Sequence, residues 1–164
     1  MGKFQFWLPT NANLTRMQRQ AIDSEEPIFL CGVPGTGKTV VSIKRLQNTA
    51  DKGKKGIIFT YGKLLRKTIE EKLENNSKMP VENIHNWMWE SQGNGKRRYF
   101  EVMIKDENIN STIELLKSKG KIYDEILVDE GQDLSLNTYK ILKELTLGLS
   151  ISADNAQQIN NRNE

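Results

Sequence analysis

The segment 32–39, with the sequence Gly-Val-Pro-Gly-Thr-Gly-Lys-Thr, constrains the fold of this 164-residue chain more than any other feature. It fits the pattern of a phosphate-binding loop, in which four residues separate the first Gly from Gly-Lys-Thr. The apolar run 28–31 before it is typical of a buried strand, and residues 40–46 after it have a helical pattern. A strand, a glycine-rich loop and a helix in this order favour a phosphate-binding site over a chance glycine turn.

The residue types of the loop suit a nucleoside triphosphate bound with Mg²⁺. Glycines let the backbone turn tightly and approach a phosphate without a Cβ clash, and successive N–H groups then form an anion site. The Lys38 ammonium group is expected to reach the β- and γ-phosphates, and the Thr39 hydroxyl to ligate Mg²⁺. We therefore expect ATP and Mg²⁺ as cofactors, held by the loop residues Gly32, Pro34, Gly35, Thr36, Gly37, Lys38 and Thr39.

Apolar runs alternate with amphipathic segments along the rest of the chain. Further strands are expected at 57–60, 81–84, 126–128 and 149–153. Further helices are expected at 14–22, 63–73, 86–90, 111–119 and 136–147. This alternation predicts an α/β fold, with a parallel sheet covered by helices on both faces. Ligands bind such sheets at the carboxyl ends of the strands, where Gly32, Thr60, Asp129 and Asp154 fall.

Other sequence features narrow the range of protein classes to which this chain could belong. The first helix is expected to bury Leu14, Met17, Ala21 and Ile22 and to be capped by Thr10 or Asn13. Cys31 is the only cysteine and is expected to pack in the core. A lone cysteine, with no apolar run of roughly 18 residues, predicts a cytoplasmic protein that does not enter a membrane. The net charge is +3, and three basic clusters are more typical of solvated surface than of binding sites: 52–55, 96–98 and 117–121.

Two carboxylates, Asp129 and Glu130, directly follow the apolar run 126–128. Hydrolysis of ATP needs a carboxylate that organises the metal and a group that activates water. Asp129 is expected to hold Mg²⁺ through its water shell, and Glu130 to polarise the attacking water. Acidic residues also follow strands without any catalytic role, but the phosphate-binding loop earlier in the chain favours the catalytic interpretation.

The segment 129–133, Asp-Glu-Gly-Gln-Asp, resembles the Asp-Glu-small-Gln-Asp signature of superfamily 1 DNA helicases of the UvrD/Rep type. Other segments resemble further motifs of that family in the same order, so the similarity covers residues 14–159: 14–18, 60–63, 83–87 and 153–157. Gly62, Asn86 and Ala153 depart from it, since they stand where the family commonly has Asn, Ser and Gly.

The resemblance implies the ATP-binding, RecA-like first domain of a DNA helicase or translocase. Residues 1–164 would form this single P-loop domain, with a short insertion at about 91–122. It implies that Gln18 reads the adenine edge and that Gln132 and Gln157 sense the γ-phosphate. Lys38, Glu130 and Gln157 would then be the catalytic residues.

The resemblance also implies two partners. The first is single-stranded DNA, which would cross the carboxyl edge of the sheet along Thr60, Tyr61, Lys63, His85 and Trp87. The second is another RecA-like domain or chain, which in this family carries the arginines that complete the ATP site. We therefore expect this chain alone to hydrolyse ATP slowly and not to unwind DNA.

Two other functions fit parts of the sequence. A small P-loop phosphotransferase, such as a nucleoside kinase, would use 91–106 as an arginine-bearing lid and would leave Gln132 and Asp133 unexplained. A non-catalytic, nucleotide-gated binding module would bind ATP and a partner without turnover. At the level of residues, Tyr61 and Trp87 suit either base stacking or core packing, and His85 suits either a phosphate contact or a structural hydrogen bond.

Overall fold

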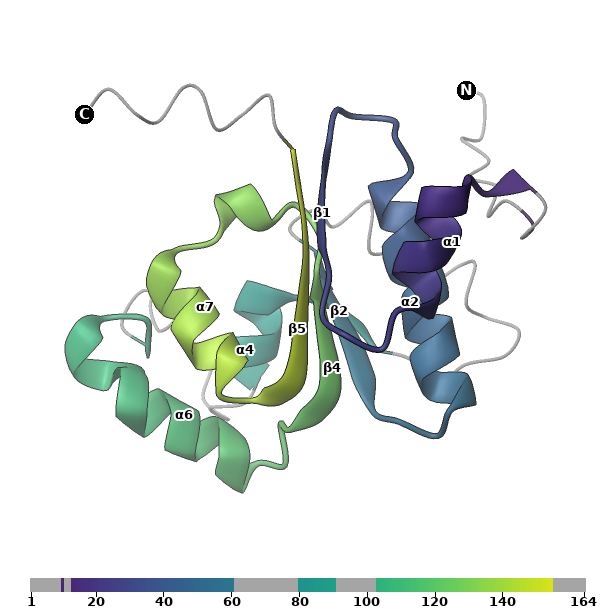
Figure 1. Cartoon of the computed structure of the whole chain (residues 1–164). Helices are drawn as coiled ribbons and strands as arrows, with labels where there is room; N and C mark the ends of the chain where they lie inside the picture. The colour runs from purple at the N-terminus through teal and green to yellow at the C-terminus, as the bar shows by residue number, and fades with distance from the viewer. Residues whose placement is uncertain (1–9, 11–12, 61–79, 91–102, 155–164) are drawn as a thin grey trace, which may run out of the picture.

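The centre of the molecule is a five-stranded sheet in which every strand runs parallel to its neighbours (Figure 1). The computed structural model describes residues 10, 13–60, 80–90 and 103–154. The strand order is β1-β5-β4-β2-β3, which puts β1 and β3 at the two edges of the described sheet. The strands are β1 (Phe29–Gly32), β2 (Gly56–Thr60), β3 (Val81–Asn83), β4 (Tyr123–Val128) and β5 (Thr146–Asp154).

Helices cover both faces of this sheet, which confirms the predicted α/β fold (Figure 1). One face carries α1 (Arg16–Asp23) and α2 (Lys38–Asp51), and the other carries α4 (Ile84–Glu90), α6 (Ile109–Ser118) and α7 (Leu136–Lys143). Short 3₁₀ helices lie at Asp106–Asn108 and Gly131–Asp133. Among the helices of the described ranges, none is both long and apolar enough to cross a membrane. Because all strands are parallel, their carboxyl ends meet at one edge, together with the loop between β1 and α2.

The larger hydrophobic cluster lies between the sheet and the helices α4, α6 and α7. Trp87 belongs to this cluster and is only 2% exposed. Its ring meets Phe59 edge-on with 4.8 Å between ring centroids, and its Nε1 donates to the Tyr123 hydroxyl at 3.2 Å. The prediction that Trp87 stacks on a DNA base is therefore wrong. Thr60, at the end of β2, is 1% exposed, and its burial likewise contradicts a side-chain contact with DNA.

The first helix starts later than its apolar pattern predicted. Thr15 caps α1 through a capping box: its hydroxyl accepts from the Gln18 N–H at 3.2 Å, and its own N–H donates to Gln18 Oε1 at 2.8 Å. Thr10 and Asn13, predicted as caps, do not fill that position. Met17 points outward and is 80% exposed, contrary to the prediction.

Strand β1 is an edge strand, so its side chains are less buried than its apolar sequence predicted. Phe29 is 61% exposed and Cys31 is also exposed, which contradicts a buried strand with a packed cysteine. The reason is the position of the strand, because β1 is hydrogen-bonded to β5 alone in the described sheet and α7 packs against β5. The helix predicted to reach residue 147 ends at Lys143, because Thr146 already pairs with Tyr123 in the sheet.

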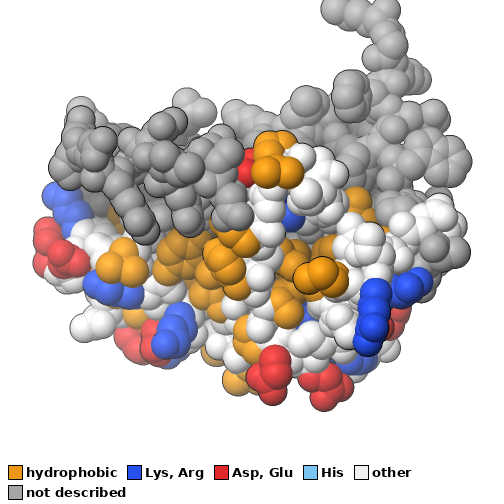
Figure 2. Space-filling model, turned by 45° about the horizontal axis from the view of Figure 1, so that its top comes forward, with side chains coloured by type: hydrophobic (Ala, Val, Ile, Leu, Met, Phe, Trp, Pro, Cys, Tyr) orange, Lys and Arg blue, Asp and Glu red, His pale blue; other side chains and the backbone are white. Residues whose placement is uncertain are grey.

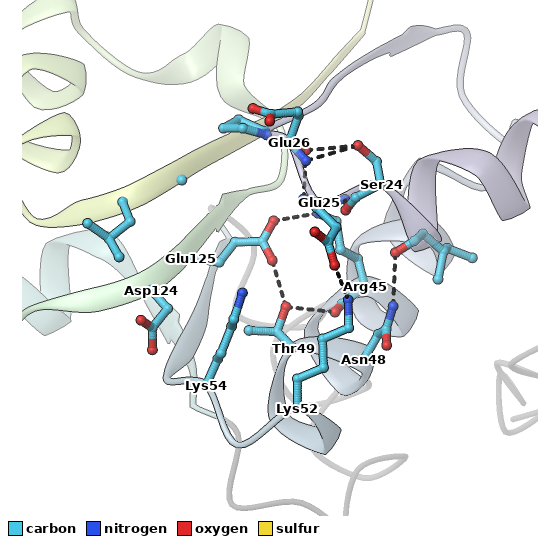
Figure 3. A pocket seen from close by; sticks show the side chains of 14 residues that line it. Ser24, Glu25, Glu26, Arg45, Asn48, Thr49, Lys52, Lys54, Asp124 and Glu125 are labelled. Carbon is cyan, nitrogen blue, oxygen red and sulfur yellow. Dashed lines mark hydrogen bonds and ion pairs between the residues drawn. The ribbon is translucent and has the colours of Figure 1, made fainter.

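At the amino edge of the sheet, a buried ion pair joins α2 to β4 (Figure 3). Arg45 is 4% exposed and its Nε is paired with Glu125 Oε1. Its other guanidinium nitrogens donate to the carbonyl oxygens of residues 21, 24 and 26 at 2.7–2.9 Å. Arg45 therefore points away from the phosphate-binding loop. A pocket of about 240 Å³ opens beside this pair, at the end of the sheet opposite the phosphate-binding loop.

Two of the three basic clusters also lie at the amino edge. Lys52, Lys54 and Lys55 occupy the turn between α2 and β2, and the cluster 117–121 spans the end of α6 and the approach to β4. Lys55 Nζ donates to the Gly120 carbonyl oxygen at 2.7 Å. These clusters are therefore remote from the carboxyl edge where DNA was expected. The cluster 96–98 and the helix predicted at 63–73 lie outside the described residues.

Candidate nucleotide-binding site

The loop between β1 and α2 has the backbone conformation that its glycines allow. Gly35 and Gly37 have φ angles of 83° and 84°, a region that glycine adopts at little cost. Gly37 is the N-cap of α2, and its carbonyl oxygen accepts from the Val41 N–H at 3.0 Å. The Thr36 hydroxyl donates to the Val33 carbonyl oxygen at 2.9 Å and closes the turn. The N-terminus of a 14-residue helix thus opens onto the loop, and its dipole favours an anion there.

The Lys38 side chain folds back onto this loop. Its Nζ donates to the carbonyl oxygens of Gly32 at 2.8 Å and Val33 at 3.1 Å. These hydrogen bonds hold the ammonium charge beside the backbone that would surround a phosphate. The structure therefore places this lysine where an electrostatic role toward phosphates is possible.

The Thr39 hydroxyl and the Asp129 carboxylate meet across the gap between α2 and β4. Thr39 Oγ1 donates to Asp129 Oδ2 at 2.8 Å, although the residues are 90 positions apart in sequence. The other oxygen, Oδ1, accepts from the Ser152 hydroxyl at 2.5 Å. Asp129 follows the end of β4, where its N–H donates to the Phe59 carbonyl oxygen at 2.8 Å. The two residues predicted to hold Mg²⁺ are thus in direct contact.

The environment of Asp129 raises its pKa above the ordinary value. Asp129 is 3% exposed, and the desolvation that accompanies burial is the largest cause of the shift. Hydrogen bonds from Ser152 and Thr39 and the charge of Lys38 act in the opposite direction, and the nearby Glu130 charge adds to the increase. A positive ion beside this carboxylate would offset the burial of its charge.

Glu130 has an unusual backbone conformation. Its φ of 59° lies in the left-handed region, and Glu130 is the only non-glycine residue with a positive φ among the described residues. Its carboxylate accepts from Gln132 Nε2 at 2.6 Å, and Gln132 Oε1 accepts from the Asp154 N–H at 3.1 Å. Gln132 therefore links the predicted water-activating group to the end of β5. Such local strain is concentrated at functional sites.

Gly131 is held tightly behind Glu130. The Tyr139 hydroxyl donates to the Gly131 carbonyl oxygen at 2.5 Å. A Cβ at position 131 would lie 2.5 Å from that hydroxyl and 2.6 Å from Ile151 Cγ2, so a larger residue could enter only if these groups moved. Tyr139, on α7, thereby fixes the backbone that carries Glu130.

Gln18 contacts the phosphate-binding loop from α1. Its Nε2 donates to the Thr36 carbonyl oxygen at 3.1 Å, while its Oε1 is bound to the Thr15 N–H. A Cβ at Gly37 would lie 2.8 Å from Gln18 Nε2, which shows how closely the side chain approaches the loop. The structure thus places Gln18 at the loop, where it positions the backbone. Its predicted contact with an adenine ring stays a prediction.

The remaining predicted residues are not gathered at this site. His85 lies just beyond edge strand β3, so β5, β4 and β2 separate it from β1 and the loop. It is half-buried, and this burial lowers its pKa. Tyr61, Lys63 and Gln157 lie outside the described residues, so their roles stay predictions. Sequence reasoning missed Ser152 and Tyr139, although a serine within a predicted buried strand was a signal for a polar contact.

The surface below the carboxyl edge carries charges of both signs. Figure 2 shows hydrophobic side chains in the middle of the visible face and Lys, Arg, Asp and Glu side chains toward its lower and lateral margins. Among the described residues, Val33 of the loop is 56% exposed and Leu136 at the start of α7 is 71% exposed.

The residues present fit ATP and Mg²⁺ in their chemistry. Mg²⁺ prefers oxygen ligands, and Thr39 and Asp129 offer a hydroxyl and a carboxylate in contact with each other. The loop offers a helix N-terminus, a lysine and two glycines in a conformation that favours close backbone approach. Glu130 supplies a second carboxylate next to the first.

A phosphate-binding loop after β1, with Thr39 in contact with a carboxylate at the end of β4, defines a P-loop, nucleotide-binding ATPase domain. The chain belongs to the AAA domain family, whose model matches residues 18–161. A solved structure of a DNA replication initiation factor is similar to it, with 18% sequence identity over 87% of this chain and a TM-score of 0.43. This chain spans 37% of the length of that one. A search of the curated proteins gives no match.

The burial of the Tyr139 hydroxyl predicts a pH dependence of stability. Burial, with a smaller contribution from the Asp133 charge, raises the pKa of Tyr139 to about 12. The unfolded chain releases this proton near the ordinary pKa of 10, whereas the folded chain keeps it, so the Tyr139 contribution to stability is complete below pH 10 and is lost as the pH rises toward 12. Urea unfolding at several pH values should show a smaller loss above pH 10 for Tyr139→Phe than for the unsubstituted chain. Equal losses in both proteins would contradict this assignment.

Proposed function

We propose that this chain is the ATP-binding, RecA-like domain of a superfamily 1 DNA helicase or translocase. The observation that carries the proposal is the 2.8 Å contact between Thr39 and Asp129, with Glu130 beside it. It combines a metal-ligating pair with a second carboxylate at the end of the same strand. The similarity of segment 129–133 to the helicase signature, and the place of Gln132 between Glu130 and Asp154, support this family over a simple phosphotransferase.

In this proposal each residue has one task. Lys38 and the loop backbone bind and orient the phosphates, and Thr39 and Asp129 hold the metal. When bound, Mg²⁺ supplies positive charge against the oxygens of the β- and γ-phosphates. Glu130 positions the water and accepts its proton. Gln132, whose Oε1 accepts from the Asp154 N–H at the end of β5, senses whether the γ-phosphate is present. Gln157, beyond the described residues, has the same task.

Rapid hydrolysis also needs an arginine that stabilises charge on the γ-phosphate, and such a group contributes ~10³–10⁵ in rate. Arg45 does not serve, because its guanidinium is bound to Glu125 and to backbone carbonyl groups at the amino edge. We infer that a second RecA-like domain, in the same polypeptide or in a partner chain, supplies this arginine. Closure of two domains around ATP would also drive movement along DNA.

ATP binding should depend on Lys38. Lys38→Ala removes a positive charge beside the phosphates and leaves the loop glycines in place. Hydrogen bonds to a charged group contribute about 1.5–3 kcal/mol, so the affinity for ATP with Mg²⁺ should fall roughly 10- to 100-fold. Calorimetry with both proteins measures this change. Lys44→Ala on the same helix is the matched control and should bind like the unsubstituted chain. Equal affinity for Lys38→Ala would show that the nucleotide binds elsewhere.

Hydrolysis by this chain alone should be slow. A typical turnover of ~10 s⁻¹ without its arginine falls to on the order of 10⁻² s⁻¹ or less. Glu130→Gln should remove this residual activity while ATP binding persists. Glu144→Gln, at an exposed acidic residue that caps the C-terminus of α7, should change neither. The measurement is steady-state phosphate release. Full-rate turnover by the chain alone would contradict the need for a second domain. Arg16 and Arg19, which flank Gln18, would then be substituted to find the arginine that stabilises the γ-phosphate charge.

Single-stranded DNA is proposed to bind weakly along the carboxyl edge near His85, together with the segment 61–63. For about four phosphate contacts, the affinity should fall roughly 50-fold between 50 and 200 mM salt. Fluorescence anisotropy with a labelled oligothymidine measures this. His85→Ala should weaken binding several-fold, whereas Lys54→Ala at the opposite edge of the sheet should not. Binding that is indifferent to salt, or lost equally in both variants, would count against this path.

A further inference from the structure

Strand β5 carries a row of polar side chains where a buried parallel strand usually carries apolar ones. Ser150, Ser152 and Asp154 alternate along it and are 1%, 1% and 6% exposed. Alternate residues of a strand point to the same face of a sheet. Their register partners on the neighbouring strands include Leu30 of β1 and Leu127 of β4. Apolar side chains therefore fit this face of the sheet, and the polar side chains of β5 are an exception to it. A buried hydroxyl is costly unless it is hydrogen-bonded, and so these serines need partners.

Each serine donates to one carboxylate that belongs to β4 or directly follows it. Ser150 donates to Glu125 Oε1 at 2.9 Å, and Ser152 donates to Asp129 Oδ1 at 2.5 Å. The first carboxylate pairs with Arg45 of α2 and the second accepts from Thr39 of α2. The two serines are therefore equivalent in strand, burial and type of partner. They differ in location, since only Ser152 lies at the phosphate-binding end.

We propose that Ser152 is a positioning residue for the Mg²⁺-dependent part of nucleotide binding. Its hydroxyl holds Oδ1 of Asp129, and the carboxylate then presents Oδ2 to the Thr39 hydroxyl. Without Ser152, the buried carboxylate loses one of the two side-chain hydrogen bonds that fix its orientation. Outer partners that orient a metal ligand typically contribute 10- to 100-fold to metal affinity. This inference rests on the proposed nucleotide site.

The alternative is that Ser152 only satisfies a buried carboxylate, as Ser150 does. The two roles differ in what they affect. If Ser152 has only a structural role, its removal lowers the stability of the fold and leaves the Mg²⁺ requirement of ATP binding unchanged. If Ser152 is a positioning residue, its removal raises the Mg²⁺ concentration that ATP binding requires and leaves the affinity for ATP without Mg²⁺ unchanged.

The test compares Ser152→Ala with Ser150→Ala in the full chain. ATP binding is measured by calorimetry in excess EDTA, and again as Mg²⁺ is titrated at fixed ATP. For Ser152→Ala, the half-saturating Mg²⁺ concentration should rise about tenfold or more, while the affinity in EDTA stays within about twofold. Ser150→Ala should change neither quantity, although both variants lose stability in urea. Ser152→Cys, of similar size and with a weak S–H donor, should show an intermediate rise and serves if the alanine variant does not fold.

A double-mutant cycle identifies the route of the effect. If Ser152 acts through Asp129, then Ser152→Ala should cause no further rise in an Asp129→Asn background. An unchanged Mg²⁺ requirement in Ser152→Ala, or an equal rise in Ser150→Ala, would overturn the proposal. Failure of the unsubstituted chain to bind ATP would instead contradict the proposed function itself, so the two failures are distinguishable.

Discussion

Two carboxylates associated with strand β4 fasten helix α2 to the sheet, and the position of the phosphate-binding loop depends on both. Glu125 holds the middle of the helix through Arg45 and Thr49, and Asp129 holds its first turn through Thr39. Burying an ion pair costs desolvation free energy, and only good geometry with additional hydrogen bonds offsets that cost. Arg45 meets this condition, since it also binds three carbonyl oxygens. The helix therefore cannot slide along the sheet without breaking a buried polar contact at each point.

The order and type of most described elements could be predicted from the sequence because apolar runs and helical periods alternate clearly. The faces of individual side chains could not. Strand order places β1 at an edge, and nothing local to residues 28–31 indicates this, so Phe29 and Cys31 were assigned to the core wrongly. Trp87 was assigned to DNA because its segment resembles a DNA-contacting motif. The motif locates a segment, whereas contacts with Phe59 and Tyr123 decide where the ring points.

At the site, the sequence could predict the location of the residues that follow from motif spacing, and their roles stay predictions. Lys38, Thr39 and Asp129 follow from the loop and from the end of an apolar strand, and the structure brings them to one edge. The supporting residues required the fold. Ser152 meets Asp129 only because β5 lies between β1 and β4, and this order has no signature in the chain. Tyr139 contacts Gly131 in a fold where α7 and the 3₁₀ helix Gly131–Asp133 both pack against β5.

Helices α1 and α2 are joined to each other at both ends. At one end, Gln18 is bound to the loop through the Thr36 carbonyl group, and at the other, Arg45 is bound to the chain that leaves α1. Any tilt of the loop helix therefore carries Gln18 with it. A change in the angle of either helix would displace both the phosphate-binding loop and Gln18. Diversity among proteins built on this plan should then appear in the segments attached to this helix pair rather than inside it.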